Sequence, residues 1–362
     1  MIFRFACYVA TVPNARLLFL RFWGKLTSRK GRLLLFSGFA SRLATSNKKG
    51  RPIRRNIPVE KQEYNKVVKY LKILVTTAFV TVAATFLSNP QTYMQSFLDG
   101  VTVWAHNVLP ALFPFAVLSP LAIKFFPKFK RSFTKAAFGV RADDVYAISL
   151  LCGYPLGAKC IADTAFDKET ATRLCSFCSS ASPIFVVATV GTKLLRNYTA
   201  TLILLVSHLL STLINGLLYR KRSDQTSSLE TRIAPSDLGD ALTSSLLSAL
   251  SVGGLIALFF VLTDVVKSWL PQAVAQHVAI NFVFGLVEMT NGIIALCATC
   301  DTFCATVFSS FLLAFGGMCV FAQSIAFLAD KIHVGKFLQM KFTQASIATL
   351  LSFVLCIIFL KI

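Results

Sequence analysis

The sequence has 362 residues, of which 55% are hydrophobic and 15% are charged, and its mean hydropathy is +0.65. A soluble domain usually carries about 25% charged residues. Several apolar runs reach the roughly 20 residues that cross a bilayer. These values exclude an ordinary soluble enzyme fold and predict an all-α, polytopic membrane protein.

The net charge of +21 comes mainly from an N-terminal tail and a few short connections, a pattern that sets topology in membrane proteins. No zinc-finger spacing or aromatic-interleaved basic module appears, so we expect no nucleic-acid partner. Residues 1–63 form a basic tail in which Glu60 is the first acidic residue. A transit peptide, a cytoplasmic tail on anionic lipid and an over-extended start site would all look like this. We expect a disordered or interfacial tail outside the functional fold.

The first membrane half is predicted at residues 64–222. Residues 69–87 form a candidate span, 91–107 a mixed stretch at the interface, and 108–126 an apolar segment bent by three prolines. The basic cluster at 124–141 is then cytoplasmic by the positive-inside rule. A long apolar region follows, and a clean span at 199–219 ends on a basic triplet, again cytoplasmic.

The long apolar region, residues 148–191, is interrupted at 153–159 and again at 179–183. Glycine and proline break helices, and unpaired backbone at membrane depth is tolerated only where protein, water or a ligand covers it. Two such breaks in succession predict a lined cavity.

A polar linker at residues 223–240 precedes a second half at 241–362, which has the same layout. Its predicted parts are a span at 241–266, interrupted segments at 279–296 and 303–328, a basic connection at 331–341, and a last span at 342–360. The charge rule makes each half cross the membrane in the opposite sense. This parity predicts an inverted repeat with a ligand site at the midplane.

The first break contains five candidate solute-binding residues, Gly153, Tyr154, Pro155, Gly157 and Lys159. Its free N–H groups and its lysine could receive an anion or a polar solute. The alternative is a structural kink whose lysine extends to the interface.

Hydroxyl groups and an amide make up the next candidates. Ser179, Ser180 and Ser182 cluster at the second break, although hydroxyls in membrane helices often bond only their own backbone. Gln323, with Ser324, follows the glycine pair at 316–317. His208 lies in the middle of a span, where a helix–helix hydrogen bond is the commoner role.

Glu288 is a carboxylate with apolar flanks, and such a group usually faces a cavity or a partner. Asn291 shares its helical face at i+3, and Lys159, at the equivalent place in the other half, is the expected cationic partner. An interfacial glutamate near a helix end is the alternative.

The ten cysteines lie mostly in apolar segments without nearby histidines, so we read them as small residues at helix contacts, with a soft-metal role as the alternative. No nucleophile–base–acid constellation appears, so we expect no enzyme activity and no cofactor.

Several stretches together resemble the YlbJ-type sporulation integral membrane proteins, which carry the nucleoside recognition or Gate domain. They are GYPLGAK, RLCSFCSSASPIFVVATVG, LLVSHLL, GLVEMTNG and FLLAFGGMCVFAQ. The chain departs from that pattern in the residues before Pro183. The resemblance implies a multi-pass protein of a bacterial cell membrane in a spore-forming lineage. We also expect its basic N-terminus to be cytoplasmic.

The function predicted from these features is a secondary transporter or permease for a small polar solute, with a nucleoside as one candidate. Divalent metal transport through thiols and Glu288 is a second hypothesis, and a non-transporting spore envelope assembly protein is a third. Expected partners are the solute and membrane lipid, and a homo-oligomer is left open.

Overall fold

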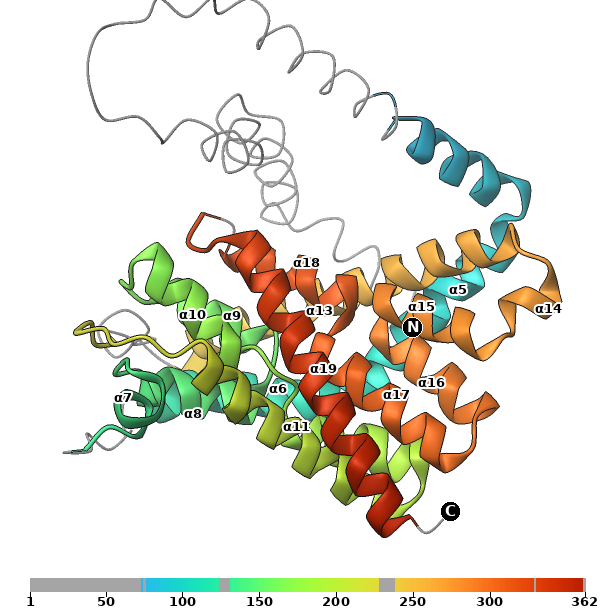
Figure 1. Ribbon diagram of the computed structural model, residues 1–362. Coiled ribbons are helices and arrows are strands. Elements are labelled where there is room, and N and C mark those ends of the chain that lie inside the picture. Colours follow the sequence, from blue (N-terminus) through green and yellow to red (C-terminus); the bar gives the residue numbers. More distant parts are fainter. Residues whose placement is uncertain (1–72, 74–75, 124–130, 228–237, 329, 361–362) are drawn as a thin grey trace, which may run out of the picture. The chain divides into compact units, whose positions relative to one another are not determined.

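The computed structural model describes residues 73, 76–123, 131–227, 238–328 and 330–360, and Figure 1 shows their arrangement. The predicted basic tail, residues 1–63, lies outside them. The described residues belong to one compact unit, Ile73–Ile362. Within it the secondary structure is helical, apart from one isolated β-bridge between Arg141 and Thr226.

A long helix begins at Pro90. Proline is suited to the first helical position, because a backbone N–H there would have no partner within the helix. It runs as α5 (Pro90–Val103), the π-helical turn η2 (Trp104–Val108) and α6 (Leu109–Ile123). The predicted interfacial stretch at 91–107 is therefore wrong, because these residues continue into the proline-containing segment as one helix. Pro110 cannot donate to the carbonyl of His106, and the ammonium of Lys193 donates to that carbonyl instead, at 3.2 Å.

The predicted breaks in the first half are confirmed. After α7 (Phe133–Phe138), the chain forms α8 (Asp143–Cys152) and α9 (Leu156–Asp163), which are separated at the first break. The second break separates α10 (Lys168–Cys178) from the π-helix η3 (Phe185–Leu195), and α11 (Tyr198–Leu218) follows.

The second half also breaks where predicted. It comprises α13 (Leu238–Ser268), α14 (Gln272–Ala275), α15 (Val278–Val287), α16 (Met289–Thr299), α17 (Thr302–Phe315), α18 (Gly317–Leu328) and α19 (Val334–Phe359). Glu288 separates α15 from α16, and Gly316, at φ +85°, separates α17 from α18. The predicted basic connection at 331–341 is too long, because α19 begins at Val334 and includes Lys341.

Among the described residues, five helical stretches are long and apolar enough to cross a membrane: Pro90–Leu118, Tyr198–Leu218, Leu242–Ser268, Thr302–Leu328 and Val334–Phe359. Their outward faces stay apolar, as Leu202, Val206 and Leu210 show on α11 and Phe353 and Ile357 on α19. Figure 1 shows α19 in red beside α11, and the two helices pack on one another. Exposed apolar surface of this extent indicates an environment other than water, so the chain is an all-α, polytopic membrane protein.

Two connections that the charge rule assigned to the same side lie side by side. Arg141 pairs with Thr226, and the amide of Ser223 donates to the carbonyl of Gly139 at 2.8 Å. We expect both to be cytoplasmic and Lys267, at the other end of α13, to face outside. In a cysteine-free background, a thiol at position 135 should react with impermeant maleimide only from the cytoplasmic side, and a thiol at 267 only from outside. Labelling of position 135 from the outer face would contradict the topology.

Candidate functional site

The two breaks of the first half pack directly on each other. Gly153 has φ +70°, and a Cβ built there would lie 2.4 Å from the amide nitrogen of Ser182. The backbone N–H of Tyr154 donates to the carbonyl of Ser180 at 2.9 Å. Position 153 therefore requires glycine for two reasons: its backbone is left-handed, and the second break lies too close for a side chain.

The carbonyls freed at the end of α10 are paired by side chains from other helices. Asn215 on α11 donates to the carbonyl of Ser176 at 2.8 Å, and Nε2 of His208 lies 3.2 Å from the carbonyl of Ala181. Helix C-termini leave such acceptors unpaired, and within a membrane they must find donors in the protein. His208 thus contacts the backbone of the second break, and not a neighbouring helix as predicted.

Lys341 supplies a third donor, and the sequence reasoning missed it. Its ammonium donates to the carbonyl of Ser179 at 2.6 Å and to Oε1 of Gln344 at 3.2 Å, and it lies 5.6 Å from the ring centroid of Tyr154. The side chain is buried. The signal available in the sequence was the glutamine three residues after the lysine, a spacing that places both on one helical face.

Glu288 caps the helix that follows it. One carboxylate oxygen accepts the backbone N–H of Thr290 at 3.1 Å and the other accepts that of Asn291 at 2.7 Å. Only 1% of the residue is exposed. Gly317, at φ +70°, passes close to this break, since its Cβ would lie 3.2 Å from the amide nitrogen of Met289.

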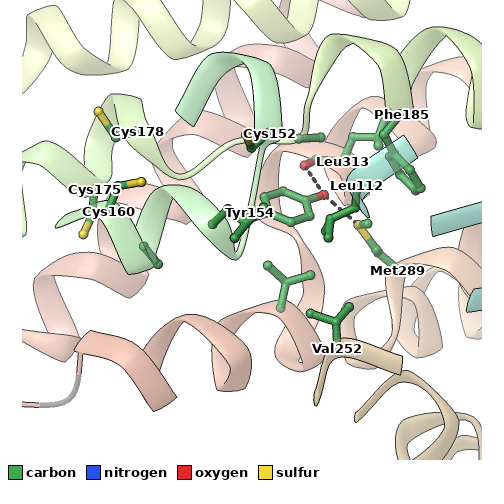
Figure 2. Close-up of a cluster of buried hydrophobic side chains, with 14 of the residues drawn as sticks. Leu112, Cys152, Tyr154, Cys160, Cys175, Cys178, Phe185, Val252, Met289 and Leu313 are labelled. Atoms are coloured by element: carbon green, nitrogen blue, oxygen red, sulfur yellow. Dashed lines mark hydrogen bonds between the residues drawn. The ribbon is translucent and has the colours of Figure 1, made fainter. Parts of the chain in front are cut away.

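Tyr154 joins the two halves. Its hydroxyl lies 2.9 Å from Sδ of Met289 and 3.3 Å from the carbonyl oxygen of Leu313. Figure 2 shows the ring pointing toward these two residues and away from Cys160 and Cys175. The first break of one half therefore contacts both breaks of the other.

A cavity of about 40 Å³ lies at this junction. Its lining is mostly apolar, with polar groups from both halves: Tyr154, Ser182, Glu288, Thr290 and Gln323. By the volume that one water needs, it has room for about three water molecules. A mostly apolar pocket with a few convergent polar groups is the usual form of a small-molecule site.

The predicted site residues divide into two groups. Tyr154, Ser182, Glu288 and Gln323 line the cavity. The others do not line it: Gly153, Pro155, Gly157, Lys159, Ser179, Ser180 and Asn291. Of these, the two glycines allow the two breaks to pack closely, and the carbonyls of the two serines accept hydrogen bonds. Asn291 donates its backbone N–H to Glu288.

The expected pairing of Glu288 with Lys159 is wrong for this structure. The ammonium of Lys159 donates to the hydroxyl of Ser244 at 2.9 Å, and the carboxylate of Glu288 is held by backbone N–H groups. We now expect the double variant Glu288→Gln/Lys159→Met to show additive losses of unfolding free energy, within about 0.5 kcal/mol, as independent sites do. Thermal or denaturant unfolding of the wild type, the two single variants and the double variant measures this. A coupling energy above about 1 kcal/mol would show that Glu288 and Lys159 interact after all.

The described cysteines form no disulfide, and five of them, Cys152, Cys160, Cys175, Cys178 and Cys319, are buried in the main core and its helix contacts. Cys152 and Cys319 line the cavity. Among the described residues no three His, Cys, Asp or Glu side chains gather as metal ligands. Neither the Cys175–Cys178 pair nor the Cys297–Cys300 pair gathers further ligands in the part of the chain that the structure describes.

These features define a multi-pass, all-helical membrane protein whose interrupted helices surround a small, partly polar cavity. The sequence is 29% identical to the sporulation integral membrane protein YlbJ of Bacillus subtilis (strain 168), over an alignment of 309 residues that covers 71% of this chain and 76% of the relative. This similarity supports a YlbJ-type protein, as the motifs predicted, and it does not show the Gate domain. No family profile matches the sequence, and no solved structure matches the chain.

Proposed function

We propose that this chain is a membrane transporter that binds a small polar solute in the cavity between its two halves, and that it acts in sporulation, as the name of its relative states. The observation that supports this proposal best is the cavity itself. Four interrupted segments from the two halves meet there, and a buried carboxylate lines it. Interrupted helices around a midplane site are characteristic of secondary transporters.

The proposed mechanism is alternating access between two halves related as an inverted repeat. Opening the cavity would separate the hydroxyl of Tyr154 from Met289 and Leu313, its contacts at the two breaks of the second half. A nucleoside is much larger than about three water molecules, so its binding requires that these breaks separate. A cavity of about 40 Å³ favours a smaller solute.

Divalent metal transport is a second candidate, supported by the two thiols and the carboxylate on the cavity wall, Cys152, Cys319 and Glu288. The lack of a three-ligand group among the described residues counts against it. Loss of binding after thiol alkylation would favour it over a polar organic solute.

The test is a binding screen of nucleosides, inorganic phosphate and divalent metals against the purified full chain, followed by uptake into proteoliposomes. Gln323→Met removes a cavity amide with little change in volume and should lower solute affinity at least tenfold, because a buried partner group loses its hydrogen bond. Gln339→Met, at an exposed position of α19, is the matched control and should keep wild-type affinity. Absence of any selective uptake would favour the assembly role instead.

A further inference from the structure

Glu288 is a buried carboxylate without a cationic side chain beside it. The ion pairs among the described residues join Lys135 to Asp224, and Glu169 to His333 and Lys336. None includes Glu288. A buried ionised carboxylate is stable only when it is paired or well hydrogen-bonded, and two backbone N–H groups at the start of α16 supply part of that stabilisation.

Capping α16 does not explain why position 288 is an acidic residue. Neutral serine, threonine or asparagine caps a helix as well as an acid does, and Asn197 caps α11 in this way. The acidic cap Asp301 of α17 lies at an exposed helix start, where its charge is solvated. Glu288 instead lines the cavity, so its carboxyl group is available to a ligand there.

The other groups facing the cavity are suited to one small cation. Oxygen-bearing side chains from three different segments, Tyr154, Ser182 and Gln323, share its wall with the carboxylate, and hard cations prefer oxygen ligands. The titratable neighbours are Tyr154, Cys152 and Cys319, which carry no positive charge. The lysines near these elements are engaged elsewhere.

Those lysines are Lys267 and Lys341. Lys267 lies 5.2 Å from the ring centroid of Phe284, one turn before Glu288. Lys341 is hydrogen-bonded to Ser179 and Gln344 behind the ring of Tyr154. Neither lysine forms an ion pair with the carboxyl group of Glu288, so neither supplies a positive charge to balance it.

We propose that the cavity takes a single monovalent cation, a proton or an alkali ion, with the carboxylate of Glu288 as its charge partner. The inference rests on the proposed function, because it assigns an ion to the solute site. One carboxylate balances one positive charge, and a divalent ion would leave an excess charge in a mostly apolar cavity. A volume near 40 Å³ holds an alkali ion with about two waters.

The test measures the thermal unfolding midpoint of the purified full chain in NaCl, KCl or choline chloride at equal ionic strength, at several pH values between 5 and 8.5. A ligand that binds only the folded state raises that midpoint with its concentration. We expect NaCl or KCl to raise it relative to choline chloride if the ion is an alkali metal. A rise on acidification alone identifies a proton.

Glu288→Gln should abolish this dependence, and the matched control Asp301→Asn, an acidic helix cap at an exposed position, should keep it. If Glu288→Gln does not fold, the rate of Cys319 alkylation in the otherwise cysteine-free chain gives the same answer, because a cation in the cavity should slow it at least threefold. No effect of either alkali ion or of pH, or an effect that survives in Glu288→Gln, overturns the inference. Solute uptake without any cation effect would leave the proposed function standing and remove only the ion.

Discussion

Gly157→Ala is expected to prevent the first half from packing, although the chain should still insert into the membrane. A Cβ at Gly157 would lie 2.1 Å from the carbonyl oxygen of Cys178 and 2.9 Å from Oγ of Ser149. The nearer atom belongs to the backbone of α10, so no rotamer change relieves the contact. Overpacking usually costs about 1–3 kcal/mol and occasionally more, and a backbone clash of this size should reach at least the upper end of that range.

The measurement is size-exclusion chromatography and thermal unfolding of the variant in detergent. Gly254→Ala is the matched control, because nothing lies within 4 Å of the added Cβ and alanine is about 0.5–1 kcal/mol better than glycine inside a helix. We expect that control to be at least as stable as the wild type. A monodisperse Gly157→Ala protein with an unchanged unfolding midpoint would contradict the packing of α9 on α10.

The breaks were predictable because they depend on local chemistry. Glycine, proline and polar residues inside apolar runs interrupt helices wherever they fall, and the interruptions at Gly153, Ser179, Glu288 and Gly316 lie where the sequence placed them. The helix order of the two halves follows from the same signals. Packing between elements far apart in sequence leaves no such local mark.

Lys159 and Lys341 show this limit. Both are single lysines near apolar segments, and the motif around Lys159 made it the better candidate for a buried charge. The structure places Lys159 beside Ser244 and buries Lys341 at the carbonyl of Ser179. Whether Lys341 is buried depends on where α19 begins. Because α19 begins at Val334, Lys341 lies about two turns inside the helix, and sequence patterns locate helix ends poorly.

The meeting of Tyr154, Ser182, Glu288 and Gln323 at one cavity was predicted only in outline. An inverted repeat implies that broken segments approach the midplane, but it does not say which side chains face each other. Tyr154 reaches Met289 and Leu313, which no motif singled out. Such contacts depend on side-chain packing across the interface between the halves.

Lys341→Met is expected to leave the protein folded and to lower transport at least tenfold. The variant loses the donor to the Ser179 carbonyl, and an unpaired buried acceptor costs about 1–3 kcal/mol. It also no longer buries an ammonium group, whose desolvation costs several kcal/mol. These terms oppose each other and are similar in size, so the unfolding midpoint should change little.

Activity should respond differently, because the ammonium contacts the second break and the cavity-lining ring of Tyr154 at once. It holds the carbonyl at the second break and lies over the ring of Tyr154, and methionine can do neither with a comparable interaction. The matched control is Lys336→Met on the same helix, whose ammonium bonds Glu169 of α10 at 3.0 Å at the surface, where an ion pair contributes about 0–1 kcal/mol. Uptake of the solute that the binding screen identifies is the measurement. Wild-type uptake by Lys341→Met would show that the lysine serves only to bond the carbonyl of Ser179. Loss of uptake in both variants would show that transport depends on the general packing of α10 on α19.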